Sequence, residues 1–271
     1  MNDTPTIRPM TINDWDGFQK SDKEIFPDDS INEEWFKKRI ERDGFFALDL
    51  DARIIGQLIL ALFGESEGHL GRIGVIRNHQ GEGYGNLLMK YAIEWFRKQK
   101  VVEQINLYTQ NHNKVAQNLY KKYGFRISGN TWHYFIPYDS LKPINRYTCQ
   151  EILEHEIDIV GDKYADTLPA AQIRQFLSNE DFHVLTLKNL VGEIVGACRF
   201  TPSFPGCFPF LLDHLDSFDD FLIGLRPFSL PDYDYYRITF TDYPKLAQVC
   251  EERNYKLHHR LYKMTLVLPE S

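Results

Sequence analysis

Several features that would assign this chain to a familiar class of protein are scarce or missing. Its 271 residues include only four cysteines, whose positions follow neither metal-ligand nor redox spacing, so we expect free thiols. The longest apolar run, Leu58–Phe63, is far too short to span a membrane, and the first residues contain no apolar signal core. We therefore expect a cytoplasmic protein with no membrane partner and no metal.

An excess of basic charge is also missing. The formal net charge is −7, and it arises entirely from residues 146–271, which hold 12 Lys and Arg against 19 Asp and Glu. This balance argues against a nucleic-acid partner, because binding to phosphates depends on clustered Lys and Arg. It allows a cationic partner, although an ordinary solvated acidic surface explains the same counts.

Two common nucleotide-binding motifs are absent from the glycine-rich segment 74–86, GVIRNHQGEGYGN. A Walker A loop requires Gly-Lys-Ser/Thr, which does not occur here. A Rossmann fingerprint requires glycine at the sixth position counted from Gly81, and Asn86 stands there. The strand expected next also ends in Tyr-Thr-Gln rather than in the acid that a Rossmann site uses.

The glycines that this segment does contain favour the binding of an anion. Gly81, Gly83 and Gly85 lack a Cβ atom and can adopt positive φ, so the backbone can approach a ligand closely. The helix expected to follow offers unpaired N–H groups and the positive end of its dipole. The segment therefore predicts a pyrophosphate site that needs no lysine; a purely structural turn is the alternative.

Hydrophobic periodicity predicts an α/β fold with a mixed sheet whose front half is antiparallel, in the order β-α-α-β-β-β-α-β-α-β. The expected strands are 6–9, 45–50, 54–62, 69–76, 105–110 and 125–137. The expected helices lie near 12–20 and 31–41, directly after the glycines, and at 113–123. The proline-bearing stretch 138–143 is the expected linker, which gives two domains, 1–140 and 141–271.

The second half of the chain echoes the first. Residues 182–200 have the strand–turn–strand pattern of residues 45–63, and residues 236–266 follow the pattern of residues 105–135. The glycine-dense turn has no counterpart, because only two glycines occur between Ala197 and Tyr235. We interpret the second half as a degenerate copy without a pyrophosphate site; two unrelated α/β domains are the alternative.

Two motifs carry a resemblance to a known family. The first is Gln80-x-x-Gly83-x-Gly85, between a strand and an amphipathic helix. The second, further along the chain, is Asn113-x-x-Ala116-x-x-Leu119-Tyr120-x-x-x-Gly124-Phe125. In this order they resemble the acetyl-CoA-binding motif and the second signature of the GNAT (Gcn5-related) superfamily of N-acetyltransferases. The resemblance covers roughly residues 5–138 and implies a tandem of two GNAT-like domains, the first catalytic and the second degenerate.

The resemblance implies acetyl-CoA as co-substrate and assigns binding roles to individual residues. The strand around Ile73 and Val75 would diverge from the next strand and pair with the pantetheine arm, and an N–H near Val75 would polarise the thioester carbonyl. The side chain of Asn113 would contact the cofactor. The CoA pyrophosphate would bind the backbone amides of consecutive residues, namely Gln80, Gly81, Glu82, Gly83, Tyr84, Gly85 and Asn86.

The resemblance also suggests Tyr120 as the general acid, since a phenol with a pKa of about 10 can donate a proton to the departing thiolate. Simple packing of Tyr120 in the core of its helix is the alternative. The attacking ammonium needs a base, and several family members carry a glutamate at the strand position that is His69 here. Strand periodicity places His69 on one face with Gly71, Ile73 and Val75.

The sequence offers other candidates for the general base, and the second copy lacks the candidate general acid. Glu65 and Glu67 share the parity of His69, and relay through ordered water is equally compatible with the sequence. At an offset of 130 residues, Cys250 stands in the place of Tyr120 and Tyr243 in the place of Asn113. The second half would therefore be catalytically silent, forming a wall of the acceptor site or replacing a dimer partner.

The predicted function is acetyl transfer from acetyl-CoA to an amine by direct attack, because no Ser, Cys or His constellation suggests an acyl-enzyme. The acceptor would be a small-molecule or peptide amine, and the protein a monomer or homodimer. The alternative is a non-catalytic acyl-CoA-binding module whose acidic C-terminal half docks a partner.

Overall fold

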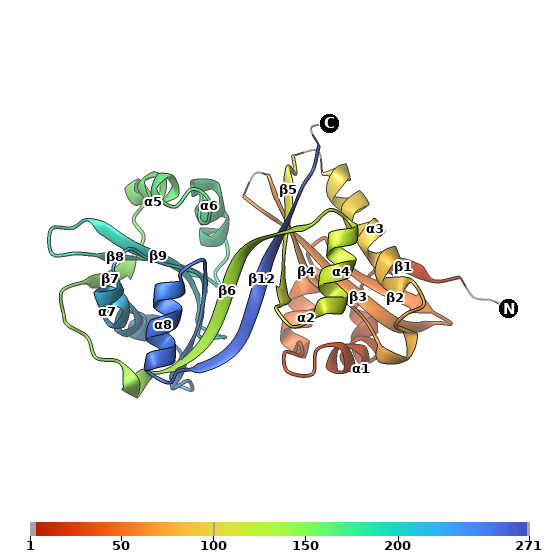
Figure 1. The fold of residues 1–271 in the computed structure, drawn as a ribbon, viewed down its shortest axis with the longest axis horizontal. Coiled ribbons are helices and arrows are strands. Elements are labelled where there is room, and N and C mark those ends of the chain that lie inside the picture. The colour runs from red at the N-terminus through yellow and green to blue at the C-terminus, as the bar shows by residue number, and fades with distance from the viewer. Residues whose placement is uncertain (1–3, 65, 100, 270–271) are drawn as a thin grey trace. The chain divides into compact units, whose positions relative to one another are not determined.

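The computed structural model describes residues 4–64, 66–99 and 101–269. The chain forms two compact units, each with its own core (Figure 1). Unit 1 comprises Met1–Ile127 together with Met264–Ser271, and unit 2 comprises Ser128–Lys263. Within the described ranges, no helix combines the length and the apolar character that crossing a bilayer requires.

Unit 1 is a mixed sheet with an antiparallel front half, as predicted. Its order is β1-β2-β3-β4-β5-β12, in which β4 and β5 are the parallel pair. Its strands before the last are β1 (Thr6–Pro9), β2 (Phe45–Leu50), β3 (Arg53–Phe63), β4 (Glu67–Val75) and β5 (Gln104–Gln110). Its helices are α1 (Trp15–Ile25), α2 (Glu33–Ile40), α3 (Tyr84–Lys98) and α4 (Lys114–Lys122).

Local chemistry explains where these elements begin and end. The Asn32 side chain caps α2 by accepting a hydrogen bond from Trp35 N at 2.8 Å. The β2–β3 hairpin turns at Asp51 and Ala52, which both adopt positive φ. Helix α4 stops before Gly124, whose φ of +91° suits the residue after a helix.

Unit 2 repeats this succession of elements. Its order is β12-β6-β11-β10-β9-β8-β7, and α5 and α6 precede the β8–β9 hairpin as α1 and α2 precede β2–β3. The strands are β6 (Arg126–Pro137), β7 (Thr148–Glu151), β8 (His183–Lys188), β9 (Ile194–Thr201), β10 (Gly206–Leu212), β11 (Tyr235–Thr241) and β12 (Lys256–Val267). The helices are α5 (Ile157–Lys163), α6 (Ala170–Leu177), α7 (Phe218–Gly224) and α8 (Pro244–Glu252).

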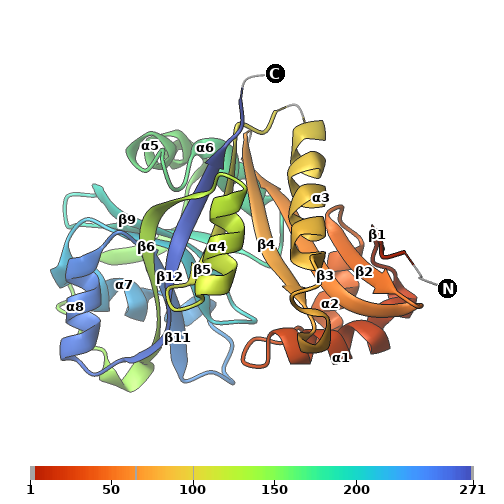
Figure 2. The ribbon, with the colours of Figure 1, turned by 45° about the vertical axis from the view of Figure 1, so that its right-hand side comes forward.

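The end of the chain returns to unit 1, which the sequence did not indicate. Strand β12 is the neighbour of β5, and Figure 2 shows its C-terminal end beside that strand. Met264 is fully buried, and Leu268 N donates a hydrogen bond to Glu103 O at 2.7 Å. Packing therefore divides the chain at Ser128 and again at Met264, whereas the division into domains 1–140 and 141–271 stays a prediction.

Candidate functional site

The parallel pair β4–β5 opens partway along its length. Paired residues run from Glu67 with Gln104 to Leu70 with Leu107, and β4 then continues to Val75 without further pairing to β5. Over the same stretch β4 stays paired with β3. The opening leaves one backbone edge of β4 facing away from any neighbouring strand.

The residues expected to meet the pantetheine arm lie on this open edge. Ile76 N donates to Ile55 O of β3 at 2.9 Å, and in an antiparallel pair only every second residue bonds to the partner strand. Ile73 and Val75 are the residues in between, so their N–H and C=O groups point away from β3. Val75 O accepts a hydrogen bond from Gln80 Nε2 at 2.9 Å, so the Gln80 side chain ties the following loop to the end of β4.

The glycine loop forms an open cradle at the start of α3. Gly81 and Gly83 have φ of +84° and +92°, and a Cβ atom on either would meet nothing within 4 Å. The amide of Asn86 donates to Gly83 O at 3.0 Å. Within the described residues, the amides of residues 81–85 donate to no backbone carbonyl. These amides are open to an anion, and their binding of a pyrophosphate stays a prediction.

Gly85 serves a different purpose from the other two glycines. Its φ is not positive, and a Cβ atom on it would lie 3.3 Å from Leu119 Cδ2 of α4. Its small size thus allows α3 and α4 to pack closely. Between the glycines, the Glu82 carboxylate lies 3.3 Å from His79 Nδ1, and the Tyr84 ring centre lies 6.1 Å from that of His79.

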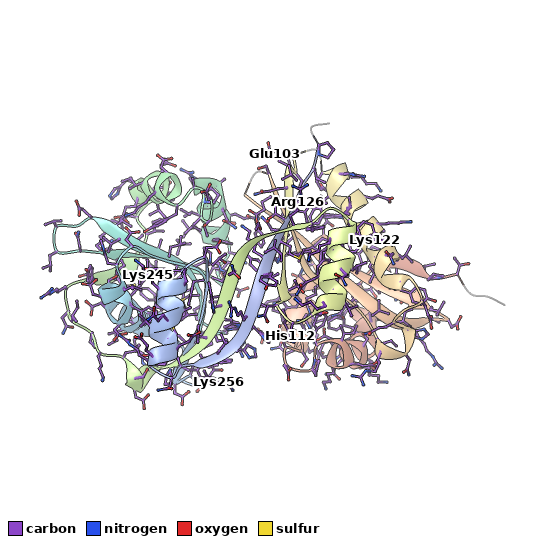
Figure 3. The ribbon with its side chains drawn as sticks, viewed as in Figure 1. Glu103, His112, Lys122, Arg126, Lys245 and Lys256 are labelled. Carbon is purple, nitrogen blue, oxygen red and sulfur yellow. The ribbon has the colours of Figure 1, made fainter. Side chains whose placement is uncertain are left out.

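Sequence reasoning missed two groups that α4 brings to the cradle. Lys122 Nζ donates to Asn86 Oδ1 at 2.7 Å, and the Tyr123 hydroxyl donates to Asn86 O at 3.1 Å. Lys122 lies on α4 (Figure 3). The cradle was predicted to need no lysine, yet a lysine borders it. The basic last turn of α4 was visible in the sequence, but its contact with Asn86 depends on how the two helices pack.

Asn113 and Tyr120 lie at the two ends of α4. Asn113 Oδ1 accepts from Ala116 N at 3.0 Å, so the side chain expected to contact the cofactor also caps the helix. Tyr120 is only 6% exposed, with its ring 6.2 Å from that of Phe125. Burial raises the pKa of Tyr120 to about 12. The phenol packs in the core and stays protonated, as a general acid requires.

His69 does not share a face with Ile73 and Val75, contrary to the strand-period prediction. Ile59 pairs with Arg72 and the next residue of β3, Leu60, pairs with Leu70, so Gly71 forms a β-bulge. This extra residue places the side chains of the β4 residues before it on the opposite face of the sheet from the one that simple alternation predicts. The His69 side chain therefore lies on the face with Arg72. Glu67 keeps the parity of His69, whereas Glu65 lies outside the described residues.

The face of β4 that carries His69 is the one covered by α1. A Cβ atom on Gly74, which has the same parity as Arg72, would touch Ile25 of α1. On the other face, a Cβ atom on Gly68 would touch the Phe96 ring of α3. The His69 ring centre lies 5.4 Å from that of Phe63 and 5.9 Å from that of Tyr108.

A buried polar network fixes α1 on this same face. Asp22, only 1% exposed, accepts at Oδ1 from Arg72 at 2.8 Å and from Gln57 Nε2 at 2.6 Å. Its Oδ2 accepts from Ile31 N at 2.7 Å, which anchors the loop between α1 and α2. No sequence pattern indicates this network, because its members are far apart along the chain.

The corresponding place in unit 2 is filled by the protein itself. The first turn of α7 holds two buried carboxylates, Asp219 and Asp220. Asp220 accepts hydrogen bonds from four backbone amides just before β7, those of Ile144, Asn145, Arg146 and Tyr147. No described residue between β10 and α7 has positive φ. Buried carboxylates repel an anion, so unit 2 has no counterpart of the cradle.

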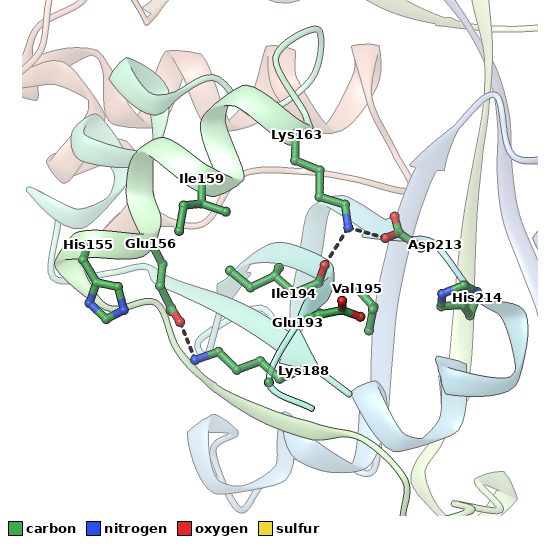
Figure 4. Close-up of a pocket in the computed structure, with 11 residues that line it drawn as sticks. His155, Glu156, Ile159, Lys163, Lys188, Glu193, Ile194, Val195, Asp213 and His214 are labelled. Carbon is green, nitrogen blue, oxygen red and sulfur yellow. Dashed lines mark hydrogen bonds and ion pairs between the residues drawn. The ribbon is translucent and has the colours of Figure 1, made fainter. Parts of the chain in front are cut away.

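Unit 2 has a pocket of about 690 Å³ beside α5, lined by both charged and apolar side chains (Figure 4). Its two lysines are both paired: Lys188 with Glu156, and Lys163 with Asp213 at 2.5 Å. Paired lysines leave the pocket less suited to a charged ligand than the glycine cradle. In the described part of the chain, no group of three or more His, Cys, Asp or Glu side chains is arranged to hold a metal ion.

Comparison with known proteins agrees with this geometry. Residues 10–125 match the family model described as the acetyltransferase (GNAT) family. No curated protein matches the sequence significantly. A putative acetyltransferase from Pyrococcus horikoshii is similar in structure, with a TM-score of 0.72 and 16% identity over 98% of this chain and 91% of that one.

Two further structures extend the similarity. A GCN5-related N-acetyltransferase from Sphaerobacter thermophilus has a TM-score of 0.69 and 12% identity, over 97% of this chain and 95% of that one. A tandem GNAT protein from the clavulanic acid biosynthesis pathway has a TM-score of 0.64 and 13% identity, over 99% and 100%. The chain thus has a GNAT fold throughout, and residues 10–125 match the model of the GNAT acetyltransferase family.

Proposed function

We propose that this protein is an N-acetyltransferase that transfers the acetyl group of acetyl-CoA to an amine by direct attack. The observation that carries the proposal is the combination, within unit 1, of the opening between β4 and β5 with the amide cradle at the start of α3. An extended thioester arm suits the first, and a pyrophosphate suits the second. The acceptor is a small-molecule or peptide amine, and the protein is a monomer or homodimer.

The residues present fit acetyl-CoA in detail. The open edge at Ile73 and Val75 offers main-chain groups to the amides of the pantetheine arm. The cradle from Gly81 to Gly85 offers unpaired N–H groups to the pyrophosphate. Lys122 adds a positive charge at its border, where phosphates gain most from a nearby cation.

The reaction forms a C–N bond and breaks a C–S bond. The Val75 N–H, directed into the opening, stabilises negative charge on the carbonyl oxygen. His69, or a water molecule held near it, accepts the proton that the ammonium must lose before it attacks. Tyr120 donates a proton to the departing thiolate and regains one that the attacking nitrogen releases as the amide forms; its buried phenol is in the required protonated form.

Substitution of Tyr120 by Phe tests the proposal. We expect kcat to fall at least about ten-fold, with little change in acetyl-CoA affinity, because the acid acts only as the thiolate departs. The assay is CoA release from acetyl-CoA across polyamines, aminoglycosides, amino acids and peptide N-termini. Tyr134→Phe is the matched control, since Tyr134 is a buried tyrosine of unit 2 whose pKa is also raised to about 12.

The outcomes separate the two candidate functions. An unchanged kcat in Tyr120→Phe would remove Tyr120 from the mechanism. Binding of acetyl-CoA without CoA release for any amine would favour a non-catalytic acyl-CoA-binding module instead. No binding of acetyl-CoA at all would contradict both.

A further inference from the structure

One face of the unit 2 sheet carries a cationic and aromatic cluster. Tyr134 and its even-numbered neighbours on β6 pack in the hydrophobic core, so His133 and Phe135 lie on the opposite face. The ring centres of His133 and Phe135 are 5.6 Å apart, and the guanidinium carbon of Arg237 on β11 lies 5.1 Å from the Phe135 ring centre. We call these three residues, with His258 and His259, the β6 cluster.

Strand β12 adds two imidazoles to the β6 cluster. The rings of His258 and His259 lie 4.9 and 6.0 Å from that of His133. They also lie 3.8 Å from each other, although successive residues of a regular strand point to opposite faces. A local irregularity of β12 therefore directs both rings to the same place. Lys256 Nζ, 5.4 Å from the Phe135 ring centre, adds a further positive charge.

Two polar atoms in the β6 cluster are buried without a hydrogen-bond partner, namely His133 Nε2 and Arg237 Nε. Neither residue forms an ion pair with a carboxylate in the described part of the chain. Leaving such groups unsatisfied costs free energy, so native proteins rarely do so without a reason.

The charges around His133 point the same way. Burial, together with the positive charges of His258, Arg237 and His259, lowers the pKa of His133 to about 3. Each of these neighbours is cationic or can become so. Arg237 is thus a guanidinium to which the described part of the chain supplies no carboxylate, and it lies beside the neutral imidazole of His133.

We propose that the β6 cluster binds the carboxylate or phosphate group of a small molecule, with Arg237 and His133 as its direct ligands. A guanidinium presents a planar fork of donors that matches both anions. Arg237 is held for this task, since its guanidinium carbon lies 3.9 Å from the Phe204 ring centre on one side and near Phe135 on the other. Every residue involved belongs to unit 2, whereas the acetyl-CoA cradle belongs to unit 1.

The test is titration of the full-length protein with inorganic phosphate and with citrate, in the absence of acetyl-CoA. We expect saturable shifts of the His133 imidazole signals by ¹⁵N NMR and a matching calorimetric isotherm. Arg237→Gln should weaken binding at least ten-fold, the scale of losing a charge-assisted pair. Arg226→Gln is the matched control, because Arg226 also stacks on a ring, Tyr138 at 3.9 Å, but lies outside the cluster.

A second variant keeps the test decisive if Arg237→Gln folds poorly. Thr239 pairs with His133 in the sheet register, so Thr239→Asp would supply a carboxylate from within the protein. This variant should fold at least as stably as the wild type and lose binding of both anions.

Three results would overturn the proposal. One is the absence of saturable binding of either anion, and another is equal binding by Arg237→Gln. The third is a response of His133 to CoA alone that disappears in Gly83→Val, because the anion would then be the cofactor's own phosphate at the cradle.

Discussion

At the scale of single residues, the three glycines around the start of α3 show that one spacing can have two physical causes. Gly81 and Gly83 are required by positive φ in open surroundings, whereas Gly85 is required by its close approach to Leu119. The sequence predicted the cradle itself, because glycine spacing before a helix is a local signal. It could not separate the two causes, because Leu119 belongs to another helix.

The strained position Gly83 leads to a binding prediction. Gly83→Val should raise the Kd for acetyl-CoA at least ten-fold, and cost about 1–2 kcal/mol of folding free energy, because a side chain at φ +92° is unfavourable. Gly192→Val is the control, since Gly192 has φ +85° with equally open surroundings in unit 2. It should lose similar stability and bind acetyl-CoA normally. Isothermal titration and urea unfolding measure both quantities, and equal binding by the two variants would contradict the cradle.

The protonation state of Tyr120 leads to a pH prediction. Because burial raises its pKa to about 12, the phenol is a proton donor at every pH below that value and is lost only above it. We therefore expect kcat to show no alkaline decline up to about pH 10, where an ordinary tyrosine would be half ionised. The pH–rate profile of the wild type checks this. A decline near pH 9–10 that is absent from Tyr120→Phe would contradict the assignment of Tyr120 as a buried acid.

At the scale of elements, the bulge in β4 determines which face of the strand carries the His69 side chain. Periodicity placed His69 with Ile73 and Val75, and this was wrong because Gly71 is an extra residue relative to β3. A bulge is a property of the pairing between two strands, so a single strand's pattern does not reveal it. The main-chain direction of Ile73 and Val75 is unaffected, since both follow the bulge.

Deletion of Gly71 should therefore be more harmful than substitution at the same position. Without the extra residue, either Leu70 leaves its buried place or the strand loses its register with β3. We expect a loss of about 2 kcal/mol or more, the scale of exposing one leucine. Gly71→Ala should be nearly neutral, because a Cβ atom there would make ordinary contacts at 3.6 Å. Urea midpoints compare the two, and equal stability would contradict the role of the bulge.

At the scale of the whole molecule, the chain is not divided into two consecutive segments. Residues Met264–Ser271 belong to unit 1, where β12 occupies the place beside β5. The sequence predicted the order of elements in the first half and an echo of it in residues 182–200 and 236–266, and the structure has the same succession of elements in both halves. It did not indicate which strand β5 would pair with, because β6 and β12 have similar patterns and either could form that edge.

A fragment of residues 1–140 should therefore fold poorly by itself. It lacks the fully buried Met264 and the buried Leu268, and it leaves β5 as an exposed edge. The loss should be about 3 kcal/mol or more, from two apolar side chains. A synthetic peptide of residues 256–269 should restore the folded circular dichroism signal, whereas a peptide with Met264→Asp and Leu268→Asp should not. Full stability of the fragment without peptide would contradict the observed packing.

The sequence alone determined the succession of helices and strands, the amide cradle and its loss from the second copy. Each of these depends on residues that are neighbours along the chain. Only the tertiary structure decided the face of His69, the approach of Lys122 to Asn86, the β6 cluster and the return of the last strand to unit 1. Each of those depends on register and packing between distant segments, which local patterns do not specify.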